Sequence, residues 1–285
     1  MGLVLGTRRP NAPAAGLDPA RPPHPAARAD GSAGGPGLLS APGPAGPSAP
    51  SSPYIPAIRE SLIGFAAGLL LAALLAAVAE SVTGYRPSSN APVPVAVTAA
   101  NLLGLWAGLA GAAVVTSRRR GTGSLGADFG FRVGAWWDVP LGAAVGLACQ
   151  YALVPLLYLP FEHFNRSLSR DISKPAHHVA DAAHGPLTAA VIVVLLAVGA
   201  PLVEELYFRG LLQRSLLTRM PPAFAIGTSS VLFALAHFEA VQFVGLALFG
   251  AVLGYMAWKT GRLGPSVAAH MAFNAAAVAA VVHLR

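Results

Sequence analysis

Three apolar stretches near the carboxyl-terminal end of the sequence each carry polar side chains that would be costly in contact with lipid. These side chains are Glu204, Glu205, Arg209, His237, His270 and Asn274. A carboxylate and an imidazole can activate water, and an imidazole with a carboxamide can stabilise an oxyanion. The residue types therefore predict one buried site, assembled from three helices, that hydrolyses an amide bond.

The carboxylate pair lies in "EELYFR", where Glu205 and Arg209 are one helical turn apart. At this spacing the guanidinium can neutralise the Glu205 carboxylate, which predicts a structural ion pair. Glu204 points about a hundred degrees away on a helix and has no local partner, so it is the better candidate for chemistry. The alternative is that both glutamates cap a helix end at the level of the lipid headgroups.

The two histidines lie in separate stretches. "FALAH" places Phe233 and His237 on one face of a helix, and "HMAFN" places His270 and Asn274 one turn apart on the last helix. Taken singly, each polar residue is explained more simply by a bond to a backbone carbonyl or to a neighbouring helix. Because three consecutive segments carry such residues, a shared site explains them together.

The composition predicts an all-α membrane protein. Of the 285 residues, 54% are hydrophobic and 11% are charged, and the mean hydropathy is +0.58. The net charge is +7, but the sequence has no basic patch with interleaved aromatic residues, so we do not expect it to bind nucleic acid. The single cysteine, Cys149, excludes a disulfide framework and a cysteine zinc cluster.

Two regions of the chain differ in composition. Residues 1–56 hold 13 of the 25 prolines and show no periodic apolar face, so we expect a disordered tail. Residues 57–285 are expected to form a membrane protease domain of about seven transmembrane helices, with a four-helix catalytic core over 186–285. The apolar segments are 61–79, 93–116, 139–160, 186–208, 222–238, 241–258 and 264–284.

Basic residues predict the orientation in the membrane. The arginines and lysines that follow the second, fourth and sixth apolar segments fall on one side if the spans alternate, so we expect the amino terminus in the cytoplasm. A chain rich in Ala, Gly, Pro and Arg is typical of a bacterium with a GC-rich genome. This favours the bacterial inner membrane as the location.

Straight helices would not bring all the polar residues to one depth. His237 lies fifteen residues after Pro222, and His270 lies only about four residues into its span, so their depths differ by more than about 10 Å. Either the helix with Glu204 continues through "LLQRSLL" and the next span starts at a shallower level, or one segment is broken or tilted.

The three patterns resemble, in order and approximate spacing, the EExxxR, FxxxH and HxxxN motifs of the CAAX-processing and bacteriocin-processing (CPBP, or Abi) family of intramembrane proteases. The likeness covers about residues 186–285. It implies a CAAX-protease-like endopeptidase that acts in the lipid bilayer. Eukaryotic members trim prenylated CAAX proteins, whereas in a bacterium we expect a membrane-anchored or amphipathic peptide as the substrate.

The resemblance also implies a role for each residue of the first two motifs. Glu204 together with His237 would activate water, and Glu205 with Arg209 would support and orient that centre. Phe233 would pack beside the site and contribute to substrate binding.

For the third motif, the resemblance implies that His270 and Asn274 stabilise the oxyanion of the tetrahedral intermediate. Members of the family are often described as metalloproteases, and Glu204, His237 and His270 could supply a two-histidine, one-carboxylate zinc set. No His-x-x-x-His pair on one helix preorganises that set, so we favour a metal-independent glutamate mechanism and keep zinc as the alternative.

Two other functions use the same residue types. Buried glutamate and histidine also build the proton relays of transporters and proton-coupled channels, although no paired halves are visible in this sequence. A non-catalytic immunity or scaffold protein could keep the same fold. Both alternatives predict no peptide cleavage.

Overall fold

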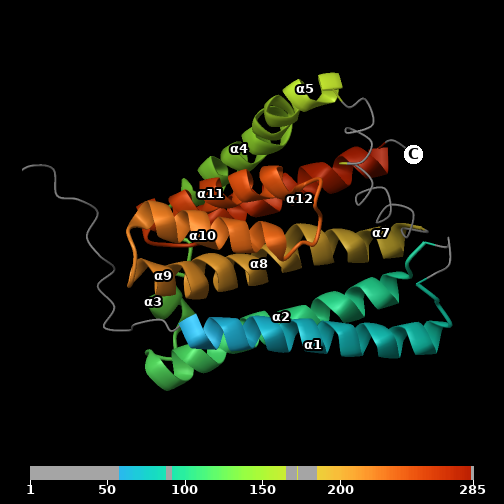
Figure 1. The fold of residues 1–285 in the computed structure, drawn as a ribbon, viewed down its shortest axis with the longest axis horizontal. Coiled ribbons are helices and arrows are strands. Elements are labelled where there is room, and N and C mark those ends of the chain that lie inside the picture. Colours follow the sequence, from blue (N-terminus) through green and yellow to red (C-terminus); the bar gives the residue numbers. More distant parts are fainter. Residues whose placement is uncertain (1–57, 88–91, 165–171, 173–184, 284–285) are drawn as a thin grey trace, which may run out of the picture. The chain divides into compact units, whose positions relative to one another are not determined.

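The structure of the chain is a computed structural model that describes residues 58–87, 92–164, 172 and 185–283. All of these residues belong to one compact unit, Pro47–Arg285. Within the described part, every regular element is a helix, which confirms the predicted all-α class (Figure 1). The predicted tail, residues 1–56, lies outside the described residues and stays a prediction.

Fourteen helical segments lie in the described part of the chain. In chain order they are α1 (Ile58–Thr83), α2 (Val95–Arg120), α3 (Leu125–Phe129), α4 (Asp138–Ala148), η1 (Cys149–Leu153), α5 (Val154–Phe164), α7 (Pro186–Val193), η2 (Val194–Gly199), α8 (Ala200–Glu204), η3 (Glu205–Gln213), α9 (Arg214–Leu217), α10 (Pro222–Leu235), α11 (Phe243–Thr260) and α12 (Gly264–His283). The three segments marked η are π-helical and continue their neighbouring α-helices without a break.

Five of the described helices are long and apolar enough to cross a membrane. They are Ile58–Thr83, Val95–Arg120, Asp138–Phe161, Pro186–Leu217 and Phe243–Thr260. The predicted count of seven is therefore not confirmed, because α10 has only 14 residues and α12 is not among the five. The fourth predicted span is longer than expected: it continues from Pro186 through "LLQRSLL" to Leu217.

Glycines let α1 and α2 approach closely along their length (Figure 1). The backbones of Gly68 and Gly108 are in direct contact, and a Cβ atom at Gly104 would meet the backbone of Leu71. Small residues at such crossings allow van der Waals packing between helices where lipid provides no hydrophobic driving force. This hairpin packs against the long helix that carries the glutamate pair, because α2 contacts both α8 and η3.

A second close helix contact positions α12. The helices α4 and α12 pack together, and Gly146 faces the backbone carbonyl of Ala269, the residue before His270. At the start of α12 the carboxylate of Asp138 accepts two hydrogen bonds of 2.7 Å from the guanidinium of Arg262. The same carboxylate accepts a bond of 2.7 Å from the backbone N–H of Gly134. These contacts tie the beginning of α4 to the beginning of α12.

The segment between α2 and α4 forms a second polar cluster. The carboxylate of Asp128 accepts hydrogen bonds from the Ser117 hydroxyl and from both the backbone N–H and the hydroxyl of Thr122. Burial alone would raise the pKa of the Asp128 carboxyl, but the hydrogen bonds from Ser117 and Thr122 outweigh burial and hold this pKa below its ordinary value of 3.8. Nearby, Trp136 is 81% exposed, as expected for a residue at the membrane interface.

Candidate functional site

The π-helix η3 places three long polar side chains in one buried row. A π-helix makes i→i+5 hydrogen bonds, so residues four or five apart stack along its surface. Glu205, Arg209 and Gln213 are four apart, and all nine residues of η3 are buried. The row faces α11, where the Arg209 guanidinium donates to the carbonyl of Gly250 at 3.1 Å and the Gln213 amide donates to the carbonyl of Gly254 at 2.9 Å.

The predicted pair of Glu205 and Arg209 is present. Nη1 of Arg209 lies 2.9 Å from Oε1 of Glu205, and both side chains are fully buried. The guanidinium also lies over the ring of Phe233, with its Cζ atom 4.3 Å from the ring centroid, a cation–π contact that helps to compensate a buried charge. Burial of either charge without the other would cost free energy of folding, so Glu205 and Arg209 stabilise each other in this position.

His270 contacts both glutamates. Its Nδ1 lies 3.1 Å from Oε1 of Glu205, and its Nε2 lies 3.8 Å from Oε2 of Glu204. A carboxylate can only accept, so the hydrogen bond to Glu205 places a proton on Nδ1. Nε2 then carries a lone pair in the neutral imidazole and an N–H in the imidazolium, and in both states it faces Glu204.

Among the described ion pairs, Glu204 makes only the long contact of 3.8 Å with His270. It is the last residue of α8, its side chain is 12% exposed, and its Oε2 is buried without a hydrogen bond to any described residue. A buried oxygen of this kind needs water, a ligand or a proton to offset the loss of solvation. Oε2 of Glu205 is also buried without a described hydrogen bond, so the two glutamates differ in the ion pair that Glu205 makes with Arg209.

The structure differs from the sequence expectation at His237. The helix α10 ends at Leu235, so His237 lies in the turn that follows and not on a helix face. Its Nδ1 still reaches the carbonyl of Phe233 at 2.8 Å. No described contact joins His237 to Glu204 or to His270. The ring of Phe233 contacts both imidazoles, with centroid distances of 4.6 Å to His237 and 5.7 Å to His270.

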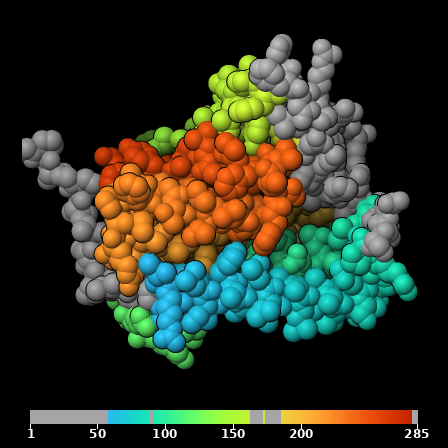
Figure 2. Space-filling view, in the orientation of Figure 1, coloured from blue at the N-terminus to red at the C-terminus, as the bar shows by residue number. Residues whose placement is uncertain are grey.

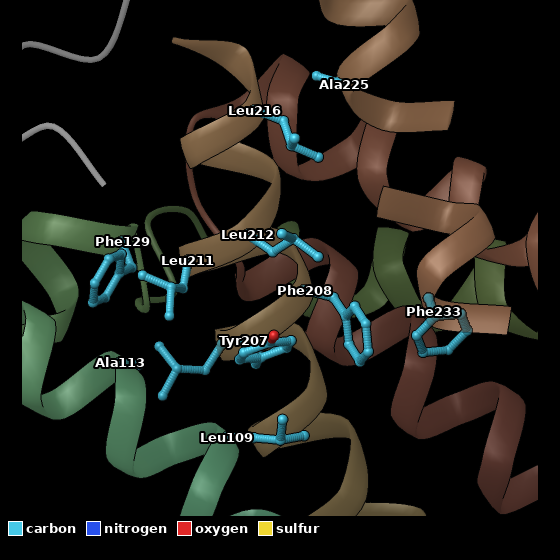
Figure 3. Close-up of a cluster of buried hydrophobic side chains, with 11 residues drawn as sticks. Leu109, Ala113, Phe129, Tyr207, Phe208, Leu211, Leu212, Leu216, Ala225 and Phe233 are labelled. Carbon is cyan, nitrogen blue, oxygen red and sulfur yellow. The ribbon is translucent and has the colours of Figure 1, made fainter. Parts of the chain in front are cut away.

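Phe233 holds this group of side chains together. It is completely buried and packs edge-on against Phe208 of η3, at a centroid distance of 5.3 Å (Figure 3). Through its other contacts it touches both imidazoles and the guanidinium of Arg209. The ring therefore sets the spacing between groups that come from three different helices.

Asn274 lies one turn beyond His270 on α12. Its amide Nδ2 donates a hydrogen bond of 2.9 Å to the backbone carbonyl of Leu196 in η2. The asparagine thus reaches the same long helix as His270, but two turns before the glutamates. No described contact joins Asn274 directly to Glu204 or His270.

The three candidate zinc ligands do not form a metal-binding cluster. Within the described residues, no group of three or more His, Cys, Asp or Glu side chains is arranged to hold a metal ion. Nδ1 of His237 is engaged with a carbonyl, and the ring of Phe233 contacts both His237 and His270. As described, these residues do not present the three-ligand set that zinc requires.

An apolar pocket of about 250 Å³ lies next to this centre, between α1, η3 and α10. Its walls include Phe208, which packs on Phe233, and two residues that flank His237 in the chain. The complete lining is Leu62, Phe65, Tyr207, Phe208, Leu212, Leu232, Leu235, Ala236 and Phe238. On the surface shown in Figure 2, α1 in blue borders the later helices in orange.

Sequence reasoning did not find several residues that position the site. Gln213 continues the row of Glu205 and Arg209 at the same spacing of four, a regularity that could have revealed it. Asp138 and Arg262 are charged residues at the starts of two apolar runs, and only the fold brings them together.

A comparison with family models gives one match in this part of the chain. Residues 186–276 match the family described as type II CAAX prenyl endopeptidase Rce1-like. Over these residues the chain is similar to that family. The match starts at the first residue of the long helix and extends past Asn274, so it contains all three motifs and confirms the resemblance to CPBP intramembrane proteases. No curated protein and no solved structure matches the chain.

The Rce1-like region covers about a third of the sequence, and α1–α5 lie before it. The match to this family and the five long apolar helices together support a multi-pass membrane protein. Within the Rce1-like region, the long helix 186–217 supplies the glutamates, α10 supplies Phe233 and the turn with His237, and α12 supplies His270.

Proposed function

We propose that this protein is an intramembrane endopeptidase that hydrolyses a peptide bond in a membrane-anchored or amphipathic peptide. The observation that supports this most strongly is the position of His270. Its two ring nitrogens face two carboxylates: that of Glu205 is neutralised by Arg209, and that of Glu204 makes no ion pair of comparable length. An imidazole placed between two carboxylates can move a proton to and from a water molecule. Helix packing alone does not require such an arrangement.

In the proposed reaction Glu204 is the general base. Its carboxylate takes a proton from water, and the hydroxide oxygen bonds to the carbonyl carbon of the scissile peptide. The carbonyl oxygen becomes an oxyanion beside Nε2 of His270, which stabilises it when His270 is the imidazolium. When the C–N bond breaks, the protonated Glu204 returns the proton to the leaving amine, so the carboxylate is regenerated.

Glu205 and Arg209 act through His270 in this scheme. Glu205 holds Nδ1 of the imidazole and so directs Nε2 toward Glu204. Arg209 supplies the opposite charge that allows Glu205 to remain ionised in a buried position. The ring of Phe233 packs against the imidazole of His270 and against the guanidinium of Arg209.

His237 is proposed as the second imidazole of the site. Its bond to the carbonyl of Phe233 assigns the proton to Nδ1, which leaves Nε2 able to accept a hydrogen bond from water or substrate. This is consistent with the water-activating role that the resemblance implies. It requires that water reach the turn after α10.

The apolar pocket suggests how a membrane-anchored substrate is held. The pocket adjoins Phe208 and the residues on both sides of His237, so an apolar group bound there would be near the reacting groups. We propose that an apolar part of the substrate occupies this pocket. The proposed location is the bacterial inner membrane, with the amino terminus in the cytoplasm.

Cleavage in reconstituted vesicles tests the proposed function. The full-length protein is incubated with a panel of membrane-anchored peptides, and the wild type is compared with Glu204→Gln, His237→Ala and His270→Ala. A matched control is Glu80→Gln, which makes the same chemical change in α1, away from the site. We expect cleavage by the wild type and the control, and strongly reduced cleavage by the three site variants.

The same vesicles distinguish the other two functions. If proton flux across the membrane depends on Glu204 and His270 while no peptide is cleaved, the protein is a transporter or channel and the proposal is wrong. If neither flux nor cleavage occurs in correctly folded protein with any peptide of the panel, a non-catalytic role replaces the proposal.

A further inference from the structure

A gap in the main-chain hydrogen bonding lies within the long helix, two turns before Glu204. In the π-helical segment η2, the backbone N–H of Ala200 donates to the carbonyl of Leu195, in the i→i+5 pattern. The next carbonyl in this pattern is that of Leu196, and its donor would be the N–H of residue 201. Residue 201 is proline, which has no N–H. The carbonyl of Leu196 is therefore left without the donor that the helix would normally supply.

Asn274 supplies the missing donor from another helix. Its Nδ2 lies 2.9 Å from the carbonyl oxygen of Leu196. An unpaired carbonyl in an apolar environment is unfavourable, so this bond satisfies a group that water does not readily reach. The match is specific, because the proline removes one hydrogen bond and the asparagine replaces that same bond.

This bond also determines where His270 lies. His270 and Asn274 are one turn apart on α12, and Leu196 and Glu204 are two turns apart on the long helix. Fixing Asn274 on Leu196 fixes the position of α12 along the long helix, and with it the position of the imidazole relative to both glutamates. The bond thus acts as a clamp between the two elements that carry the reacting groups.

We propose that Asn274 is a positioning residue that replaces the N–H absent at Pro201, and that it does not act as an oxyanion donor. This departs from the role that the family resemblance implies. The part of the inference that concerns catalysis rests on the proposed function, whereas the part that concerns the clamp is independent of any activity.

A double-mutant cycle between the two residues tests the clamp. In Pro201→Ala, residue 201 has an N–H that can donate to the carbonyl of Leu196. We therefore expect Asn274→Ala to lower the midpoint of thermal unfolding by a few degrees in the wild-type background, and by less than half as much in the Pro201→Ala background. Equal shifts in both backgrounds would show that the two residues are not linked, and would overturn the proposal.

Cleavage kinetics add a measurement that a purely structural role would not change. We expect Asn274→Ala to reduce kcat by about tenfold with little change in KM, and Pro201→Ala to restore most of this loss in the double variant. If Asn274 were an oxyanion donor, its removal would reduce kcat by about 10²–10³ in both backgrounds, without rescue. That result would also overturn the proposal.

Two controls complete the experiment. Asn274→Asp keeps the size of the side chain but removes its N–H donors, and it should behave like Asn274→Ala and respond to the same rescue. Gln242→Ala removes another side-chain amide that donates to a backbone carbonyl, that of Ile172, and it should show no coupling to Pro201. If no variant cleaves any peptide, the proposed function fails, and the thermal cycle still decides the clamp.

Discussion

Glu204 and His270 face each other across 3.8 Å, from α8 and α12 respectively. The distance is too long for a direct hydrogen bond, and Oε2 of Glu204 has no other described partner. An oxygen atom of water or substrate can therefore approach both groups. The neighbouring carboxylate of Glu205 is already bound by Arg209, so two adjacent glutamates have different surroundings and are expected to respond differently to substitution.

Glu204→Gln should remove activity without removing stability. We expect the cleavage rate to fall by about 10²–10⁴, because the general base is lost. The free energy of unfolding should change by less than about 0.5 kcal/mol, since only a long contact of 3.8 Å with His270 is lost. Initial cleavage rates in vesicles and thermal unfolding in detergent measure the two effects. A Glu204→Gln variant that cleaves at the wild-type rate would exclude the assigned role.

Glu205→Gln should mainly reduce stability. It leaves the buried guanidinium of Arg209 without its counter-charge, which typically costs about 3–5 kcal/mol. The double variant Glu205→Leu with Arg209→Met removes both charges and should recover much of this loss, while cleavage remains low. Thermal unfolding of the wild type and of both variants checks the expectation. If the single variant were as stable as the wild type, the pair would not be the structural element described.

The two members of the ion pair between Asp138 and Arg262 should contribute unequally to the free energy of unfolding. Asp138 is buried and also accepts from the backbone N–H of Gly134, whereas the Arg262 side chain is partly exposed. Asp138→Ala should therefore destabilise the protein more than Arg262→Ala does, by roughly 1–2 kcal/mol, since it leaves more donors unpaired. Chemical denaturation of both variants provides the comparison, and the reverse order would contradict it.

Asp128 should contribute a pH-dependent stability. The pKa of its carboxyl is held below 3.8 in the folded protein, so folding is favoured when this group is ionised. The contribution is fully present above the ordinary pKa and is lost as the pH falls below 3.8 through the folded value. We expect Asp128→Asn to lower the unfolding midpoint at pH 7, with the difference from the wild type disappearing in strong acid. A difference that grows in acid would show the opposite sign.

The contact between α4 and α12 should tolerate no added side chain. A Cβ atom at Gly146 would overlap the carbonyl of Ala269, next to His270, so Gly146→Ala should cost roughly 1–3 kcal/mol and reduce cleavage. Gly111→Ala is a matched control, because nothing lies within 4 Å of an added Cβ atom there. This control should be neutral or slightly stabilising. Equal effects of both substitutions on thermal unfolding would contradict the packing described.

Much of the site could be predicted because charged groups are rare and costly in apolar helices. The ion pair of Glu205 and Arg209 followed from a spacing of four, and the separate surroundings of Glu204 followed from its position beside that pair. The approach of His270 to both glutamates could not be predicted. It depends on the depth at which α12 begins, and this depth is determined by contacts with α4 and with Leu196 that are distant in the sequence.

The local irregularities were also beyond sequence reasoning. A helical pattern does not distinguish an α-turn from a π-turn, so the nine π-helical residues of η3 could not be predicted. The sequence left open both a continuation through "LLQRSLL" and a broken segment. In the structure the long helix continues to Leu217, and α10 ends at Leu235, which places His237 in a turn.

The helix α10 is short for a membrane span. Its 14 residues extend over roughly 21 Å, against roughly 30 Å of hydrocarbon in a typical bilayer, and Phe224 and Leu235 are exposed on its surface. Where a helix this short lies in a bilayer, we expect local thinning that lowers the headgroups and their hydration shell beside its end. Because His237 lies in the turn after this end, such thinning would bring water toward the imidazole.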